Sequence, residues 1–420
     1  MSVTLHTHPR VGALAPARPF PGRFMVGELA GSLGDLGTFV PIAVGMVQIV
    51  GLDAATLLVF AGLASIAAGL VFRIPMAVQP MKAIGALAIA GMLTASQVGV
   101  AGLTVGAVLL LMGALGLIGW LDRIIPRPIL RGLQMTVAIH LVLTGARMGL
   151  RLPGAAAIRP LLGPEGLLVV AGALALLLLL RRRLPLLALG LVALGLLGAA
   201  LKQPGLLDTA PITLWRPKLA AFNSASLSGI WLGGLSQVPL TLLNSVFAVA
   251  VLAGGLFPEH KTRNSPRKIA LSVGLMNVIS CPFGAMPVCH GSGGLAGQYR
   301  FGARSGLSMA ILGSVKLVIG LLFGLMALAW MRAFPSSILS VFLLVAGVGL
   351  ASASKCWQVG GGLVAAIVMV AVHVSTGILV LAFACGWIAY ALVCKLHVES
   401  VVENVRRRII GGRHTEGRNE

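Results

Sequence analysis

Charge is what this sequence has least of. Only 10% of its 420 residues are charged, whereas 57% are hydrophobic. A soluble chain of this length needs far more charge to cover its surface, so a soluble globular protein is excluded. Tyrosine is also scarce, with two residues against 55 glycines, which argues against a β-barrel with aromatic girdles. Runs such as 166–180 and 376–393 contain no charged residue, and with their flanks they reach the ~20 residues that span a bilayer. We predict an all-α polytopic membrane protein whose first partner is the lipid bilayer.

Catalytic and metal-binding signals are sparse as well. No C-x-x-C pair occurs among Cys281, Cys289, Cys356, Cys385 and Cys394, so neither a redox motif nor a zinc site is predicted. No G-x-x-x-x-G-K-[ST] loop occurs, which argues against ATP-driven transport. The remote alternative, an intramembrane enzyme, would need clustered carboxylates or a Ser/His dyad, and the only acids inside apolar spans are Glu28 and Asp35. We therefore predict no enzyme activity, no cofactor and no resident metal.

The net charge of +21 does not indicate nucleic-acid binding, because the basic residues form short clusters between apolar spans. Most of them fall on one side of the predicted topology, the side that also carries both termini, and the positive-inside rule makes that side cytoplasmic. We place fourteen segments, at 25–50, 54–72, 74–93, 98–120, 125–146, 165–180, 184–201, 226–254, 266–282, 285–302, 307–331, 335–353, 358–373 and 375–396. Residues 1–23 lack the apolar core of a signal peptide and form a cytoplasmic tail.

The two halves of the chain resemble each other. Residues 76–83 (MAVQPMKA) open the third segment and residues 286–293 (MPVCHGSG) open the tenth. Seven segments per half is an odd number, so we predict an inverted 7+7 repeat over 24–201 and 226–396, joined by a linker at 202–225. Paired interrupted segments in inverted halves mark the binding site of a transporter. We expect half-helices starting near Pro80 and near Gly291–Ser292, with Ser292 as an N-cap and both N-termini meeting at the bilayer midplane. Such ends bind anions. Alternatively, the glycines only allow close helix packing.

Four motifs carry a family resemblance: GSLGDLGTFVP (31–41), PMAVQPMKAIGA (75–86), QVPLTLLNSV (237–246) and FGAMPVCHGSGGLAGQYRFGARSG (283–306). They resemble the molybdate transporter branch of the sulfate permease superfamily. The resemblance implies a uracil-permease-like inverted repeat, with a core domain from segments 1–4 and 8–11 and a gate domain from segments 5–7 and 12–14. It places the substrate between segments 1, 3, 8 and 10. Sulfate permeases carry a regulatory domain after the last span, whereas residues 397–420 form only a short tail, which favours the molybdate branch.

The expected substrate site combines polar and glycine residues of three segments. Gln79 can donate to an oxyanion and Lys82 can neutralise its charge, while Gln237 and Asn244 lie on one polar stripe of the eighth segment. The full predicted set is Gln79, Pro80, Met81, Lys82, Gln237, Asn244, Cys289, His290, Gly291, Ser292 and Gly293. The alternatives are interhelical hydrogen bonds for the stripe, a salt bridge from Lys82 to Asp35, and a purely structural His290. His140, His373 and Lys316 match no constellation and are interpreted as structural.

The predicted function is import of a tetrahedral oxyanion by alternating access. Molybdate, bound as the oxyanion, is the expected substrate, with tungstate and sulfate as related anions and a sulfate permease as the alternative. Inward movement of an anion against a negative-inside potential costs about 2.3 kcal/mol per charge per 100 mV, which favours a symporter that takes up protons. The candidate proton carriers are Asp35, Glu28 and His290. The abundance of Ala, Leu, Gly and Arg suggests the inner membrane of a bacterium, and a homodimer is left open.

Overall fold

The computed structural model describes residues 21–89, 91–150, 184–202, 212, 214–354 and 362–394. The predicted sixth segment (165–180), the tail 397–420 and nearly all of the tail 1–23 lie outside the described residues. Six of the described helices are long and apolar enough to cross a membrane, and four shorter apolar helices accompany them. The molecule is thus a helical membrane protein, as the composition indicates.

The first half of the chain is a series of helices interrupted by a 3-10 turn, by a short strand and by a break at Gly116. The first predicted segment bends through a 3-10 turn at Leu33–Asp35. The fourth ends earlier than expected, because Gly116 adopts a left-handed conformation (φ 76°) and starts a separate short helix. The elements of the first half are α1 (Pro21–Ser32), α2 (Leu36–Gln48), α3 (Ala54–Phe72), β1 (Val78–Pro80), α4 (Lys82–Ile89), α5 (Ala95–Ala114), α6 (Leu117–Ile124), α7 (Arg127–Leu150) and α9 (Leu184–Lys202).

The second half begins with one long helical span, Ser224–Leu256. Within it, π-helical turns at Ile230–Leu235 and Thr241–Ala248 flank α10 (Ser236–Leu240), which contains Pro239. The missing N–H of a proline and π-bulges both displace side chains from a regular helix. The other elements are α11 (Val249–Leu256), α12 (Pro266–Ser280), β2 (Val288–His290), α13 (Ser292–Arg300), α14 (Leu307–Ala333), α15 (Ser336–Ser354), α16 (Gly362–Thr376) and the helix Leu379–Cys394.

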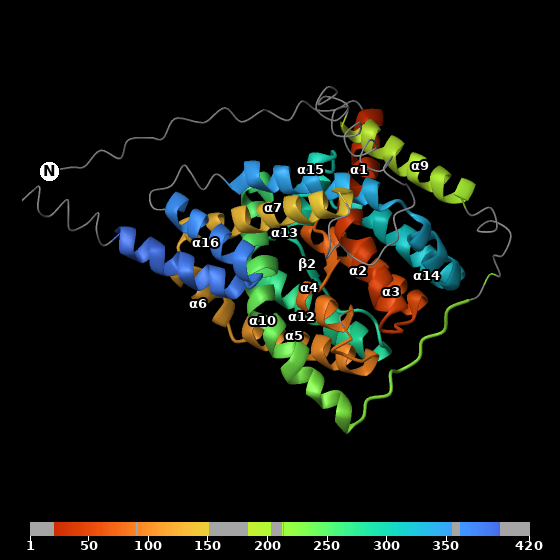
Figure 1. The fold of residues 1–420 in the computed structure, drawn as a ribbon, viewed down its shortest axis with the longest axis horizontal. Coiled ribbons are helices and arrows are strands. Elements are labelled where there is room, and N and C mark those ends of the chain that lie inside the picture. Colours follow the sequence, from red (N-terminus) through yellow and green to blue (C-terminus); the bar gives the residue numbers. More distant parts are fainter. Residues whose placement is uncertain are drawn as a thin grey trace, which may run out of the picture.

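The two predicted interruptions meet in the middle of the molecule (Figure 1). Strands β1 and β2 pair antiparallel, with Gln79 opposite Cys289, and a helix starts directly after each strand. The broken segments are therefore confirmed, with corrections to their first turns. The first half-helix starts at Lys82 rather than at Pro80. The N-cap of the second is Gly291, not Ser292, because the Ser292 hydroxyl donates to Asn244 Oδ1 instead.

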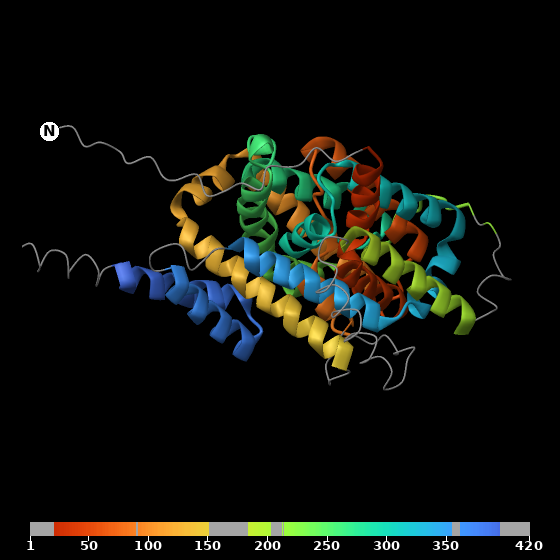
Figure 2. The ribbon, with the colours of Figure 1, turned by 90° about the horizontal axis from the view of Figure 1, so that it is seen from above.

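Helices of the two halves pack against each other in reciprocal pairs. Helix α3 packs along α14, and α12 packs along α5. The α3–α14 contact is close at Gly62 and Gly313, where a Cβ atom on either residue would lie 2.7 Å from the other's carbonyl oxygen. Here glycine does serve close helix packing. Helices α7 and α15 run side by side along one flank, with α16 against α7 (Figure 2).

Candidate functional site

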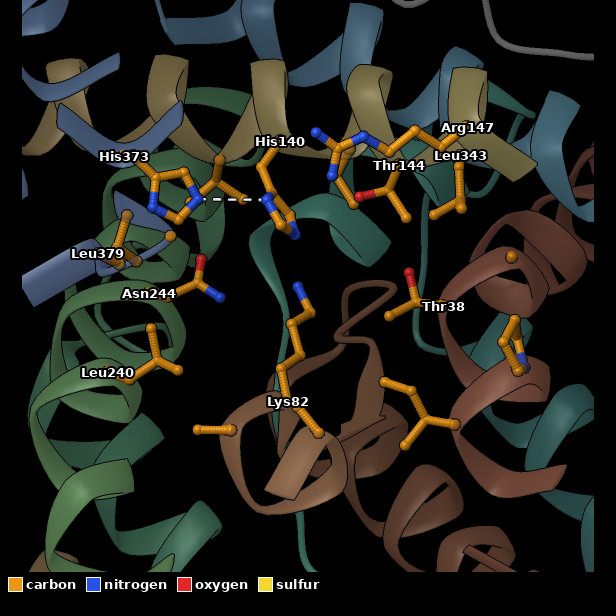
Figure 3. Close-up of a pocket in the computed structure, with 18 of the residues that line it drawn as sticks. Thr38, Lys82, His140, Thr144, Arg147, Leu240, Asn244, Leu343, His373 and Leu379 are labelled. Carbon is orange, nitrogen blue, oxygen red and sulfur yellow. Dashed lines mark hydrogen bonds between the residues drawn. The ribbon is translucent and has the colours of Figure 1, made fainter. Parts of the chain in front are cut away.

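A cavity of about 660 Å³ lies beside the crossover, between α2, α4 and α10 on one side and α7 and α16 on the other. Figure 3 shows its polar side chains turned toward a common space. No aspartate or glutamate lines it among the described residues. Its basic and polar lining residues are Thr38, Lys82, His140, Thr144, Arg147, Ser236, Asn244 and His373. A cavity with cations and hydrogen-bond donors but no carboxylate suits an anion.

Lys82 is the first residue of α4, and its side chain extends into the cavity toward His140 (Figure 3). The predicted alternative, a salt bridge from Lys82 to Asp35, is not formed. The ion pair found among the described residues joins Arg127 to Asp122 on the surface, at 3.4 Å. The Lys82 charge is therefore not neutralised by a paired carboxylate and faces the cavity next to the N-terminus of a helix, which adds a partial positive charge.

Asn244 lies on the opposite wall, in the π-helical turn of the long span. Its Oδ1 accepts a hydrogen bond of 2.9 Å from the Ser292 hydroxyl. With the oxygen occupied, the amide nitrogen is the group left to face the cavity, which Figure 3 shows. Asn244 therefore links the N-terminus of α13 to the cavity wall and presents a donor there.

Gln237 makes interhelical hydrogen bonds, which were the stated alternative for the polar stripe of the eighth segment. Its Oε1 accepts from the backbone N–H groups of Ala83 (2.9 Å) and Ile84 (3.3 Å), and its Nε2 donates to Thr241. Gln237 thus caps the first turn of α4 across a long sequence separation. The first-turn amides expected to bind an anion are partly occupied by this side chain, and Gln237 itself does not line the cavity.

A buried polar cluster occupies the space in front of α13. Gln79 Nε2 donates to Asp35 Oδ1, and both residues are almost fully buried. The backbone of α13 approaches them so closely that a Cβ on Gly294 would lie 2.7 Å from Asp35 Oδ1. The structure brings the predicted residues of the crossover together here, but none of them lines the cavity: Gln79, Pro80, Met81, Cys289, His290, Gly291, Ser292 and Gly293.

The three predicted proton carriers lie apart from the cavity, and two of them are fully engaged. Glu28 accepts three backbone hydrogen bonds at the start of α14. His290 contacts the Ala77 carbonyl through Nδ1 and the Ser272 hydroxyl through Nε2, each at 3.1 Å. Asp35 is held by Gln79, as described above.

Two histidines that the sequence analysis interprets as structural line the cavity instead. His140 of α7 and His373 of α16 are joined by a contact of 3.2 Å between Nδ1 and Nε2, and both face the space occupied by Lys82 (Figure 3). Thr38, Thr144 and Arg147 were missed as well. The one available signal was a histidine inside each of two apolar spans, and this signal does not reveal that the two spans touch.

Comparison with known proteins places these features in a family. The sequence profile described as "Molybdate transporter of MFS superfamily" matches residues 27–141 and 229–350. The chain is 38% identical to Molybdate transporter 2 of Arabidopsis thaliana, over 87% of this chain and 86% of that protein. It is 36% identical to Molybdate transporter 1 of Chlamydomonas reinhardtii, over 77% of this chain and 83% of that protein.

Two solved structures of anion transporters have a similar fold. The transmembrane domain of the bicarbonate transporter BicA of a cyanobacterium matches with a TM-score of 0.52 and 19% identity, covering 88% of this chain and 97% of that domain. Murine Slc26a9, an anion transporter solved in the inward-facing state, matches with a TM-score of 0.58 and 12% identity, covering 91% of this chain and 70% of that protein. At these identities the likeness concerns the fold alone.

Proposed function

This chain belongs to the molybdate transporter family, and from that premise we propose that it imports molybdate by alternating access through the cavity described above. Family membership supports oxyanion transport, and the matching family names describe transporters rather than enzymes. The observation that carries the proposal is the cavity at the start of α4, which is lined by Lys82, Asn244 and further donors and by no acid among the described residues.

The chemistry of a dianion explains why such a lining is needed. Moving a bare ion from water into an apolar interior costs tens of kcal/mol, so fixed donors must replace its water shell. Lys82 supplies charge, the Asn244 amide and the hydroxyls of Thr38 and Thr144 supply neutral donors, and Arg147 adds a second basic side chain. With about 30 Å³ per water molecule, a cavity of about 660 Å³ accommodates the anion with several waters.

We assign the crossover residues to a supporting role in the same site. Gln237 caps the half-helix that carries Lys82, and Ser292 orients Asn244. Gln79 and Asp35 fill the space before α13, so an anion would reach that helix only after this pair separates. In this proposal Gln79, Gly291 and their neighbours contact the substrate in another conformation of the cycle.

Alternating access requires two bodies that move against each other. We propose the core domain of segments 1–4 and 8–11, which contains α4 and α13, and a gate domain of segments 5–7 and 12–14, which contains α7 and α16. The position of the cavity between these sets of helices supports the division. The reciprocal α3–α14 and α5–α12 contacts support the inverted repeat from which both domains would be built.

The charge distribution supports an orientation of the chain in the membrane. We propose a bacterial inner membrane with both termini in the cytoplasm, because the basic loops then obey the positive-inside rule. A dianion entering against 100 mV would cost about 4.6 kcal/mol, at about 2.3 kcal/mol per charge. Coupling to proton uptake would offset that cost.

The test is uptake into proteoliposomes. The purified chain is reconstituted, an inward proton gradient is applied, and molybdate accumulation is measured by elemental mass spectrometry. We expect uptake by the wild type, strong inhibition by tungstate and weak inhibition by sulfate. Lys82→Ala should lose most of the uptake, whereas Lys261→Ala, which alters an exposed loop lysine, should match the wild type.

Each result can overturn a defined part of the proposal. If vesicles with the wild type accumulate no more molybdate than empty vesicles, oxyanion import is refuted. Equal inhibition by sulfate and tungstate would replace molybdate transport with a general oxyanion permease. Undiminished uptake by Lys82→Ala would show that this cavity is not the route.

A further inference from the structure

The histidine pair of the cavity has an unused proton-binding position. His140 Nδ1 and His373 Nε2 are 3.2 Å apart, so one of these atoms carries the hydrogen that joins them. The other ring nitrogen of His373, Nδ1, is buried and has no hydrogen-bond partner. His140 is exposed to the cavity, and Figure 3 shows its second ring nitrogen facing Lys82.

We propose that the His140–His373 pair binds the proton that enters with the anion and that, once protonated, it donates to the anion through His140 Nε2. This inference deepens the proposed function and rests on it. It assigns the proton-binding site to the gate-side helices α7 and α16. The three carriers predicted from the sequence, Asp35, Glu28 and His290, lie elsewhere.

The hydrogen count of the pair explains the coupling. A neutral imidazole carries one N–H, and an imidazolium carries two. When a proton binds His373 Nδ1, Nε2 of the same ring keeps its hydrogen and donates to His140 Nδ1. His140 must then carry its own hydrogen on Nε2, where it points at the anion. Without the added proton, the pair can take the opposite tautomer, in which His140 Nε2 is a bare acceptor that repels an oxyanion.

The charges around the pair make proton and anion binding interdependent. Lys82 from α4 and Arg147 from α7 are the other charged groups that share the cavity, and α2, α10, α15 and the helix Leu379–Cys394 contribute no acid or base to its lining. A third positive charge is therefore opposed when the cavity is empty. A bound dianion reverses that balance, and by linkage the proton must then favour the anion equally.

The alternative carriers are less suited by their contacts. The Glu28 carboxylate is occupied by three backbone N–H groups, and both ring nitrogens of His290 have partners. Neither residue, nor Asp35, lines the cavity among the described residues. Only the His140–His373 pair combines contact with the cavity and a ring nitrogen without a partner in the described part of the chain.

The test measures protons taken up per molybdate bound. Sodium molybdate is titrated into the purified full-length protein by calorimetry at about pH 7, in buffers that differ in ionisation enthalpy, so that the difference in heat reports the proton uptake. The wild type should take up as much as one proton per anion. Its affinity for molybdate should fall by about tenfold for each unit that the pH rises, over the range in which the anion-free pair has lost its proton. His373→Gln and His140→Gln should bind molybdate more weakly, without proton uptake or pH dependence.

His260→Gln is the matched control, because His260 lies in the loop after α11, outside the cavity lining, and it should behave as the wild type. Wild-type proton uptake in both His373→Gln and His140→Gln would overturn the inference. If these variants do not fold, the titration of the wild type remains a test. Molybdate binding to the wild type without proton uptake refutes the inference and leaves the proposed function standing. A wild type that binds no molybdate refutes the proposed function itself, and the inference falls with it.

Discussion

Replacing Glu28 tests whether its carboxylate has a structural role or carries the transported proton. Its Oε1 accepts from the N–H groups of Arg304 (2.9 Å) and Ser305 (3.0 Å), and its Oε2 accepts from that of Ser308 (3.0 Å). These amides precede or open α14, and the first N–H groups of a helix have no partner within it. A buried carboxylate at this place satisfies three donors and is attracted by the helix dipole.

The cost of Glu28→Gln can be worked out from these contacts. The variant keeps one acceptor oxygen and replaces the other by an NH₂ group, so at least one buried amide faces a donor. A buried donor without a partner costs about 1–3 kcal/mol, and loss of the charge at the helix terminus costs about 0.3–2 kcal/mol more. We expect the free energy of unfolding to fall by about 2–4 kcal/mol, measured by thermal or denaturant unfolding of the purified protein. Glu259→Gln, at an exposed carboxylate, is the control.

The proton stoichiometry of Glu28→Gln is the second measurement. If Glu28 only caps α14, the folded variant takes up the same number of protons per molybdate as the wild type. A variant with unchanged unfolding free energy and no proton uptake would refute this reasoning and make Glu28 the carrier.

Three further substitutions test the crossover. Gly294→Ala should abolish uptake and lower the unfolding free energy by about 1–3 kcal/mol, because its Cβ would meet Ala77 Cβ at 2.6 Å; Gly254→Ala, with open space around it, is the control in the same assays. Gln237→Leu should lower that free energy by about 1–3 kcal/mol and weaken molybdate binding, because it uncaps α4; unchanged binding by calorimetry would contradict the capping role. Ser292→Ala should weaken binding several-fold, because the Asn244 amide loses the bond that orients it; an unaltered affinity would show that Asn244 needs no such support.

The broken segments could be predicted because their signal is local. Proline and glycine interrupt apolar runs at matching places in both halves, and the structure confirms an interruption at each, with Gln79 facing Cys289. The family resemblance, carried by the same motifs, is confirmed as well. The first turns were less accurate because tertiary contacts override local rules. Ser292 suits an N-cap by residue type, but Asn244 from another span offers it a closer partner.

The lining of the cavity could not be read from the sequence for a related reason. The polar stripe of the eighth segment indicates that Gln237 and Asn244 face protein rather than lipid, yet it does not name their partners. Gln237 caps a helix more than a hundred residues earlier in the chain, and Asn244 faces the cavity. His140 and His373 come from spans that carry no motif, and their contact depends on how α16 packs against α7.

The donors of the cavity are divided between helices that the proposal assigns to different domains. Lys82 and Asn244 belong to the core side, whereas His140 and Arg147 belong to the gate side. An anion held from both sides draws the two domains together, and it can leave only when one set of donors weakens. The hydroxyl and amide donors of the lining do not gain or lose protons at ordinary pH, so they do not provide that change. The imidazole pair does, because loss of a single proton removes one positive charge and can turn a donor into an acceptor. Release of the anion and release of the proton would then be one event on the gate side, while the Gln237 cap and the Ser292 hydrogen bond hold the core-side donors in place.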